Sequence, residues 1–417
     1  MLSQLEGSRA VAGAVVCCRP QVVCAYPITP QTHIVEAIGA SVKSRQLKHC
    51  RFINVESEFA AMSVAIGASA TGARAYTATA SQGLLFMIEA VYNAAGLGLP
   101  VVMTLANRAI GAPINIWNDH SDAMAVRDSG WVMLFAEDNQ TATDLHVQAF
   151  RLAEELSLPV MVCMDGYVLT HATERVDVPT QEQVDAFLPP YKPRQVLDPA
   201  DPVSIGAMVG PEAFTEVRYL AHAKQLQALE RIGEVAGEFA EGFGRHSGGL
   251  VSTYHVEDAE VVIVALGSVL GTIKDATDEL RANGARVGVV GITSFRPFPL
   301  DALREAIGDA RKVVVVERAF SAGFGGVLST DVGLAISDAK ARLSTVVAGL
   351  GGRAVTEAGL IGVFEDALGD RLEALRFLDL DKDVVDRELA RMAGTRRSGP
   401  SAENVLRDLG TVASGAL

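Results

Sequence analysis

Short β-rich runs alternate with longer helical segments through the first 170 residues, and this alternation constrains the fold more than any other feature. The run at 21–26 precedes a segment whose apolar residues recur at helical spacing: Ile34, Ala37, Ile38 and Val42. Further runs follow in the same order: CRFINV (50–55), ARAYTAT (73–79), PVVMTLA (100–106), WVMLF (131–135) and PVMVCMD (159–165). Strand–helix alternation of this kind buries a parallel sheet between two layers of helices. The sequence therefore predicts a doubly wound α/β domain.

The alternation lapses in a stretch rich in Pro, at 188–202, and in a polar helical segment near 211–243. It resumes with the run AEVVIVALG at 259–267. Clustered Pro and Gly are typical of a connection between domains. The last stretch carries mixed charges, and we interpret it as an arm on a neighbouring chain or a mobile tail. The predicted organisation is an α/β domain at 1–175, a connection with a helix at 176–255, a second α/β domain at 256–380 and a C-terminal arm at 381–417.

Composition indicates a globular chain that does not span a membrane. Hydrophobic residues make up 49% of the sequence and charged residues 21%. The mean hydropathy is +0.24, yet apolar runs such as that at 261–267 stop far short of the roughly 18 residues that a spanning helix needs. Glu6, Arg9 and Arg19 interrupt any secretory signal at the start. We therefore expect a cytoplasmic protein.

Charge and cysteine usage exclude two further classes of function. The net charge is −14 and no cluster of Lys and Arg is present, so we expect no nucleic-acid partner. The cysteines form no C-x-x-C pair and show neither zinc nor iron–sulfur spacing. We expect them to be reduced, buried, small hydrophobic residues: Cys17, Cys18, Cys24, Cys50 and Cys163.

Polar residues that could carry chemistry follow the predicted strands directly. They are Thr29, Glu58, Ser81 with Gln82, and Arg108. Because ligands of doubly wound sheets bind outside the carboxyl ends of the strands, these residues should gather along one rim. Alternatives remain open for two of them. Glu58 suits a first helical turn, where acids complement the helix dipole, and Arg108 suits a surface ion pair as well as a bound carboxylate.

The stretch YPITPQT (26–32) is predicted to form a stiff loop at the end of the apolar run at 21–26. Pro27 and Pro30 leave Ile28 and Thr29 little conformational freedom. A stiff loop would hold the Thr29 hydroxyl at a fixed place. The alternative is an ordinary helix start, with Thr29 as N-cap and Pro30 as the first helical residue.

Signals for a metal or a phosphate group are weak. Asp119, His120 and Asp122 resemble metal ligands in type, but N-cap and loop-polar roles account for them better, and we predict no metal site. The sequence contains no G-x-x-x-x-G-K-S/T motif, and no G-x-G-x-x-G follows the first strand. GFGG at 323–326 suits either an anion-binding nest of amides at a helix start or a tight turn.

Five stretches in this order carry a family resemblance: YPITPQT, ESEFAAM, TATASQGLLFMIEA, NRAIGAPINIWNDHSD and GLGGR. Together they resemble the α subunit of 2-oxoacid:acceptor oxidoreductases, the pyruvate:ferredoxin oxidoreductase group, over about residues 8–365. The resemblance implies a pyrimidine-binding domain for thiamine diphosphate, followed by a transketolase C-terminal-like domain. It also implies a β subunit with the diphosphate-binding domain, Mg²⁺ and an iron–sulfur cluster, and γ and ferredoxin-like subunits. This chain lacks the G-D-G motif that holds the diphosphate, so it should be inactive alone.

The resemblance also implies roles for individual residues. Glu58 matches the glutamate that activates the cofactor by bonding to its aminopyrimidine ring. Thr29, Asn107 and Arg108 fall where the family binds the carboxylate of the 2-oxoacid. The remaining residues expected to contact the cofactor are Pro27, Ile28, Ser81 and Gln82.

The implied reaction is the coenzyme A-dependent oxidative decarboxylation of a 2-oxoacid to an acyl-CoA and CO₂. Electrons would pass through iron–sulfur clusters of the partner subunits to NAD or ferredoxin. Overall resemblance slightly favours phenylglyoxylate as substrate, as in the NAD-linked phenylglyoxylate dehydrogenase branch, with pyruvate as the alternative. A non-catalytic assembly subunit and the β chain of a lipoamide-linked 2-oxoacid dehydrogenase are further alternatives.

Overall fold

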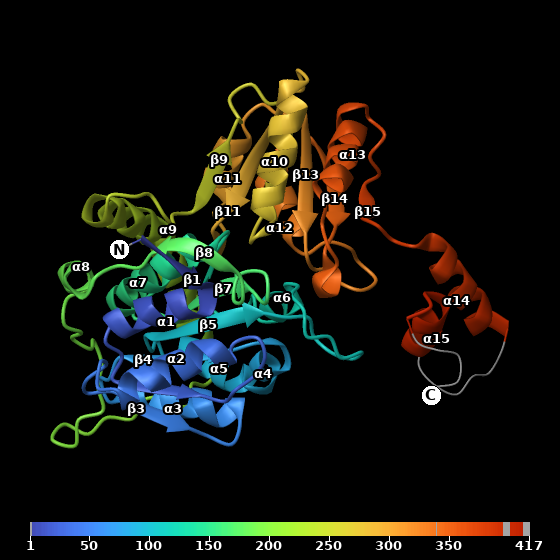
Figure 1. The fold of residues 1–417 in the computed structure, drawn as a ribbon. Helices are drawn as coiled ribbons and strands as arrows, with labels where there is room; N and C mark the ends of the chain where they lie inside the picture. Colours follow the sequence, from blue (N-terminus) through green and yellow to red (C-terminus); the bar gives the residue numbers. More distant parts are fainter. Residues whose placement is uncertain (1, 339, 395–400, 412–417) are drawn as a thin grey trace.

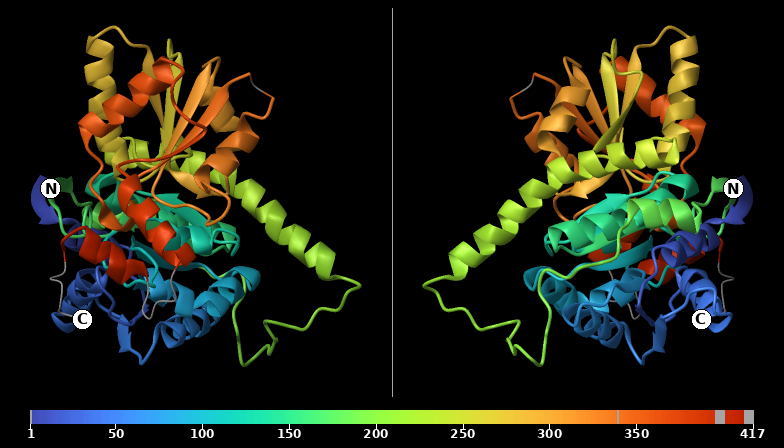
Figure 2. Two further views of the ribbon diagram at one scale, coloured as in Figure 1. Left: turned by 90° about the vertical axis from the view of Figure 1, so that its right-hand side faces the viewer. Right: turned by 90° about the vertical axis from the view of Figure 1, so that its left-hand side faces the viewer.

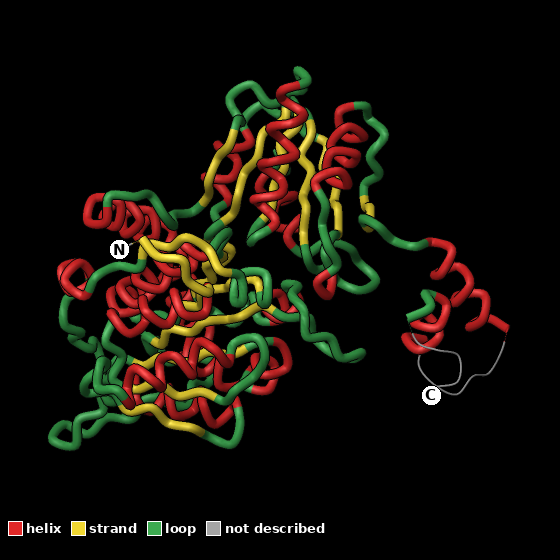
Figure 3. The backbone as a smooth tube through the Cα atoms, in the orientation of Figure 1, coloured by secondary structure: helices red, strands yellow, loops and turns green. Residues whose placement is uncertain are grey.

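The computed structural model describes residues 2–338, 340–394 and 401–411. They form two α/β bodies, one above the other in Figure 1, and a small helical arm that stands apart from both. In each body the strands lie between helices, as Figure 3 shows. The predicted α/β class is confirmed.

The first body is built on a seven-stranded sheet with the order β12-β6-β7-β5-β4-β2-β3. Its strands are β2 (Val22–Ala25), β3 (Arg51–Asn54), β4 (Ala75–Thr79), β5 (Val101–Asn107), β6 (Val132–Phe135), β7 (Val160–Asp165) and β12 (Ser294–Arg296). All pair in parallel except β12, which runs antiparallel to β6. The central strands β4, β5 and β7 are buried along their whole length, which explains their nearly continuous apolar sequences.

Helices cover both faces of this sheet, so the predicted doubly wound arrangement is confirmed. One apolar core joins a face of the sheet to α1 (Gly7–Cys17), α2 (Thr32–Lys43), α7 (Asn139–Leu156), α8 (Gln181–Phe187) and α9 (Phe214–Phe243). The other core joins the opposite face to α3 (Glu58–Ala70), α4 (Ser81–Phe86), α5 (Ile88–Gly96) and α6 (Ser121–Ala125). This second core continues without a break into the upper body, so the two bodies share buried apolar surface.

The second body has a six-stranded sheet with the order β15-β14-β13-β10-β11-β9. Its strands are β9 (Val251–Tyr254), β10 (Val261–Ala265), β11 (Val287–Ile292), β13 (Lys312–Glu317), β14 (Arg342–Val347) and β15 (Leu375–Phe377). All pair in parallel except β9. Its helices are α10 (Val269–Ala282), α11 (Leu300–Ile307), α12 (Leu328–Ala335) and α13 (Glu357–Leu368), with a short 3₁₀ turn η1 (Leu350–Gly352).

Three smaller elements complete the fold. An antiparallel ribbon joins β1 (Leu2–Glu6) to β8 (Thr173–Asp177). The arm consists of α14 (Lys382–Gly394) and α15 (Ser401–Asp408). Among the described residues, no helix combines the length and apolarity that crossing a bilayer requires.

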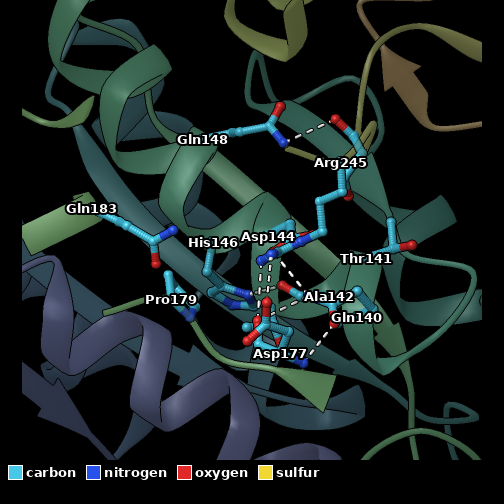
Figure 4. A network of polar contacts seen from close by, with 12 residues as sticks. Gln140, Thr141, Ala142, Asp144, His146, Gln148, Asp177, Pro179, Gln183 and Arg245 are labelled. Atoms are coloured by element: carbon cyan, nitrogen blue, oxygen red, sulfur yellow. Dashed lines mark hydrogen bonds and ion pairs between the residues drawn. The ribbon is translucent and has the colours of Figure 1, made fainter. Parts of the chain in front are cut away.

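Helix α9 connects the two bodies, and Figure 2 shows its N-terminal half extending beyond the first body. Its C-terminal half is anchored by Arg245, which lies just past the helix. The Arg245 guanidinium forks onto both carboxylate oxygens of buried Asp144 at 2.6 and 2.8 Å and reaches Asp177 at 3.2 Å (Figure 4). Charge-assisted, bidentate bonds of this kind are strong and directional. They attach the connecting helix to α7 and β8 of the first body.

Two alternatives for local structure are excluded. Helix α2 begins at Thr32 with Gln31 as N-cap, so Thr29 is not a helix cap. The backbone amides of Val327, Leu328 and Ser329 at the start of α12 donate to the Glu317 carboxylate at 2.8 to 3.2 Å. The anion-nest alternative for the preceding GFGG stretch is therefore wrong, because the protein's own carboxylate bonds to these amides.

Candidate active site

The carboxyl ends of five adjacent strands, β7-β5-β4-β2-β3, lie along one edge of the first sheet. The predicted site residues follow these strands directly, because each strand is succeeded at once by a loop or a helix start. The chain after β2 contains Thr29, the chain after β3 contains Glu58, and α4 begins after β4 at Ser81. Asn107 ends β5 and Arg108 follows it. The structure therefore brings the predicted residues onto one rim.

Glu58 is the first residue of α3, and its side chain is only 7% exposed. The N-cap role belongs to Ser57, whose hydroxyl accepts from the Ala60 amide at 3.2 Å. Within the part of the chain that the structure describes, the Glu58 carboxylate makes no hydrogen bond or ion pair. Glu58 occupies the first turn of α3, as the helix-dipole alternative predicted, and its carboxylate oxygens are not among the fully buried unpaired atoms of the described chain.

Gly83 provides the space that Glu58 occupies. A Cβ atom at Gly83 would lie 2.7 Å from Glu58 Oε1 and 2.6 Å from Thr79 Oγ1, so only glycine fits here without displacement. The Thr79 hydroxyl is itself buried, without a hydrogen-bond partner among the described residues. The first turn of α4 therefore lies directly against the carboxylate and leaves two polar groups unsatisfied.

Arg108 lies beside the stiff loop after β2. Its guanidinium donates from Nη1 to the Thr29 carbonyl at 2.9 Å and from Nε to the Asn115 carbonyl at 3.0 Å. The residue is 6% exposed and forms no ion pair within the described residues, so the surface ion-pair alternative is wrong. The carbonyl bonds fix the orientation of the guanidinium and leave Nη2 without a partner in the described chain. A planar cation held in this way suits bidentate binding of a carboxylate.

Gln31 was not among the predicted site residues, yet its side chain holds the same loop. Its amide nitrogen donates to the carbonyls of Tyr26 at 3.1 Å and Ala78 at 2.7 Å. Its buried Oε1 has no partner in the part of the chain that the structure describes. It thereby connects the chain around Pro27 and Ile28 to β4. The sequence signal that could have identified Gln31 is its place directly after Pro30, the second proline of YPITPQT.

Ser81 and Gln82 connect the exits of β4 and β5. The Ser81 hydroxyl donates to the Ala109 carbonyl at 2.6 Å and also contacts Gln82 Oε1. The Gln82 amide nitrogen lies 2.5 Å from where a Cβ of Gly111 would be placed. These contacts hold the loop after β5 close to α4.

The polar residues of this loop serve its conformation. No cluster of three or more possible metal ligands occurs among the described residues. Asp119 Oδ1 accepts from the Ser121 amide at 3.0 Å, and Asp119 Oδ2 accepts from the Gly351 amide of the second body at 3.1 Å. His120 Nε2 contacts Asp165 at 2.6 Å. Asp122 is fully buried and accepts several N–H bonds from the rim.

Asp165, at the end of β7, joins the rim to the second body. Its carboxylate binds Arg318 Nη1 at 2.9 Å, the Ser268 amide at 2.9 Å and the His120 ring. Burial by itself raises the pKa of Asp165, but the neighbouring His120 and Arg318 outweigh it and hold the pKa well below its usual range. The carboxylate therefore stays charged and links the two bodies.

The rim is open and bordered by exposed apolar side chains. They are Tyr26, Phe59, Phe86, Ile114 and Trp117, of which Ile114 is 79% and Phe86 61% exposed. The two largest of the identified cavities, of about 500 and 550 Å³, lie elsewhere, beside Leu188–Tyr191 near the amino ends of the strands. Clustered exposed apolar groups of this kind are typical of interaction surfaces.

Comparison with known families gives two matches that follow one another along the chain. Residues 13–237, more than half of the chain, match the thiamine-diphosphate-binding domain of pyruvate flavodoxin/ferredoxin oxidoreductase. Residues 259–359 match core domain II of pyruvate:ferredoxin oxidoreductase.

Similar curated proteins are subunits of 2-oxoacid oxidoreductases. Pyruvate synthase subunit PorA of Methanosarcina barkeri is 45% identical over 391 residues, which cover 91% of this chain and 97% of that protein. Ketoisovalerate oxidoreductase subunit VorA of Pyrococcus horikoshii is 40% identical, covering 87% of this chain and 92% of that protein.

Solved structures share the fold at low identity. The 2-oxoglutarate:ferredoxin oxidoreductase from Magnetococcus marinus aligns with a TM-score of 0.65 and 19% identity over 88% of this chain, which spans 65% of that chain's length. A split-gene transketolase, described as an inactive β4 tetramer, aligns with a TM-score of 0.53 and 17% identity over 88% of this chain and 99% of its own. These matches confirm the predicted fold, a thiamine-diphosphate-type α/β domain followed by a transketolase C-terminal-like domain.

Proposed function

The chain belongs to the pyruvate flavodoxin/ferredoxin oxidoreductase family, and we propose that it is the α subunit of a 2-oxoacid oxidoreductase that uses thiamine diphosphate. In this role it takes part in the coenzyme A-dependent oxidative decarboxylation of a 2-oxoacid. The observation that carries the proposal is the buried Glu58 carboxylate, which has no partner within the described chain and lies on the same rim as Arg108.

The residues of the rim fit the aminopyrimidine half of thiamine diphosphate. Glu58 is a buried acceptor or proton holder without a partner, and Thr79 and Gln31 each present an unsatisfied buried oxygen. Gly83 leaves the space against Glu58 open. An aminopyrimidine ring offers donors and acceptors to such a set. When bound, thiamine diphosphate supplies a carbon nucleophile for the 2-oxoacid carbonyl and an electron sink for the loss of CO₂.

Each residue of this chain then has a separate task. Glu58 would hold a proton toward the aminopyrimidine ring, and Ser81 with Gln82 would shape the adjoining wall. Arg108 binds the carboxylate of the 2-oxoacid through Nη2, beside the Thr29 hydroxyl. Asn107 is fully buried and its amide nitrogen donates to Asp122, so it supports the site without touching the substrate. Pro27 and Ile28 keep the Thr29 loop in place, because small errors in position lower rates severely.

The substrate we propose first is pyruvate, with ferredoxin as electron acceptor. The curated relatives named above act on pyruvate and ketoisovalerate, and none supports the expected preference for phenylglyoxylate or for NAD. Arg108 recognises only the carboxylate that all 2-oxoacids share. Phenylglyoxylate and NAD therefore remain as a second substrate and acceptor pair for the test.

We propose a β subunit as the partner that covers the rim. The exposed apolar border around Glu58 supports such a partner, and so does the absence of a G-D-G motif from the sequence. Mg²⁺ and iron–sulfur clusters would belong to the partner subunits, since this chain has no cysteine spacing for a cluster.

The deciding experiment is to purify the complex from its source and assay it with coenzyme A. Pyruvate, ketoisovalerate and phenylglyoxylate are each offered with ferredoxin or NAD as acceptor. We expect fastest reduction with pyruvate and ferredoxin, from a brown complex. If no 2-oxoacid supports reduction, the proposed function is wrong, and a colourless complex active with lipoamide would favour the lipoamide-linked alternative.

Arg108→Gln should raise the KM for the 2-oxoacid more than it lowers kcat. The substitution removes the cation, and a charge-assisted bond contributes about 1.5–3 kcal/mol, so an increase in KM of about 10- to 100-fold is expected. Steady-state kinetics of the assembled complex measure it, with Arg127→Gln, a half-exposed loop residue, as control. An unchanged KM would remove Arg108 from the binding site.

Gly83→Ala should slow turnover because the new methyl group would meet the Glu58 carboxylate and the Thr79 hydroxyl. Small displacements of a reacting group cost as much as about 10²-fold, and we expect a loss of that order in kcat. Gly67→Ala is the matched control on α3, where a Cβ meets nothing within 4 Å. That control should retain full activity, and activity lost equally in both variants would contradict the prediction.

A further inference from the structure

Asp122 collects hydrogen bonds from three residues of the candidate site. Its side chain is fully buried. Oδ2 accepts from the backbone amides of Ser81 at 3.0 Å and Arg108 at 2.9 Å. Oδ1 accepts from the Asn107 side-chain amide at 2.9 Å and from the Ala123 amide at 2.8 Å.

A local capping role does not account for these contacts. Of the four donors, only Ala123 belongs to the helix of Asp122 itself. Ser81 is 41 residues away and starts α4, whereas Arg108 is 14 residues away and follows β5. One carboxylate thus joins the exits of two adjacent strands, β4 and β5. The exit of β4 carries Ser81, which is expected to line the cofactor site. The exit of β5 carries Arg108, the cation expected to bind the substrate carboxylate.

We propose that Asp122 is a positioning residue that holds Arg108 and Ser81 at a fixed separation for binding of the 2-oxoacid carboxylate. The inference rests on the proposed function and adds to it a residue that touches neither substrate nor cofactor. Arg108 is then held at three points: its amide by Asp122, and its guanidinium by the carbonyls of Thr29 and Asn115.

The loop between Arg108 and Asp122 has a second attachment at its far end. Asn115 Nδ2 donates to the Gly351 carbonyl at 3.1 Å, and Asp119 accepts from the Gly351 amide. The second body therefore fixes the tip of the loop, and Asp122 fixes its base. Because the loop is held at both ends, the Arg108 side chain should stay in place at the rim.

The charge on Asp122 is required for this geometry. Burial raises the pKa of Asp122 to about 6, although the bonds from Asn107, Arg108 and Ser81 oppose that rise. An asparagine has the same shape but only one acceptor oxygen, so its NH₂ group must face two N–H donors. Asp122→Asn therefore either releases the Ser81 and Arg108 amides or releases Asn107 and Ala123.

The test is Asp122→Asn in the assembled complex. We expect the KM for the 2-oxoacid to rise about 10- to 100-fold while kcat changes less than about threefold, because a mobile Arg108 weakens substrate binding first. Asp128→Asn, on the exposed side of the same segment, is the matched control and should keep the wild-type KM. A folded Asp122→Asn variant with wild-type KM overturns the inference.

A second measurement needs neither turnover nor the variant. In the wild-type chain, hydrogen exchange at the Ser81 and Arg108 amides should be much slower than at Ile114 in the exposed part of the same loop. Equal exchange rates would contradict the inference even if Asp122→Asn fails to fold. A wild-type complex without 2-oxoacid-dependent reduction would overturn the proposed function instead, so the two failures are distinguishable.

Discussion

A complex assembled with the Glu58→Gln chain should lose 2-oxoacid-dependent acceptor reduction by about 10²- to 10⁴-fold, the usual contribution of positioned acid–base catalysis. Glutamine keeps the shape of Glu58 but cannot hold a proton for a ring nitrogen. The side chain makes no bond to the described chain, so its replacement should not weaken the fold.

The control for this prediction is Glu56→Gln, two residues earlier on an exposed position. Both variants should assemble with partner subunits as the wild type does, which size-exclusion chromatography measures. Near-normal turnover with Glu58→Gln would favour the non-catalytic assembly subunit over the proposed enzyme. Equal losses in both variants would point to disturbed assembly.

The parallel strands and the rim could be predicted because each depends on local sequence. Alternating apolar runs give parallel strands, and the residue after each strand then lies at the shared edge. Glu58 and Arg108 were found in this way. The burial of Arg108 without an ion pair in the described chain excludes the surface ion-pair interpretation, and burial is not visible in a short motif. Glu58 does lie in a first helical turn, and its catalytic role stays a prediction.

The contacts that hold the rim could not be predicted because they join distant parts of the chain. Ser81 and Asp122 are 41 residues apart, and Asp165 and Arg318 are 153 residues apart. The edge strand β12 likewise comes from the segment after β11 of the second sheet, yet pairs with β6 in the first. No periodicity in sequence encodes such pairings, since they depend on how two folded bodies pack.

Asp165→Asn should lower the free energy of unfolding by about 3–5 kcal/mol, the usual cost of removing one partner of a buried ion pair. Arg318 is 8% exposed and has no other carboxylate partner in the described chain, so its charge would be left uncompensated between the two bodies. Urea unfolding of the full chain measures the loss. Asp301→Asn is the control, because that side chain is 97% exposed.

The ion pair can be separated from the other contacts of Asp165 by a double substitution. Arg318→Met together with Asp165→Asn leaves no unpaired charge, so the double variant should be more stable than Asp165→Asn alone. Acid titration gives an independent reading. Because folding lowers the pKa of Asp165, its contribution to stability is present above the unfolded pKa of about 4 and is lost as pH falls toward the folded value. In the Asp165→Asn variant, the free energy of unfolding should therefore fall less steeply below pH 4 than in the wild type. A double variant that is no more stable than Asp165→Asn alone would show that other contacts join the two bodies.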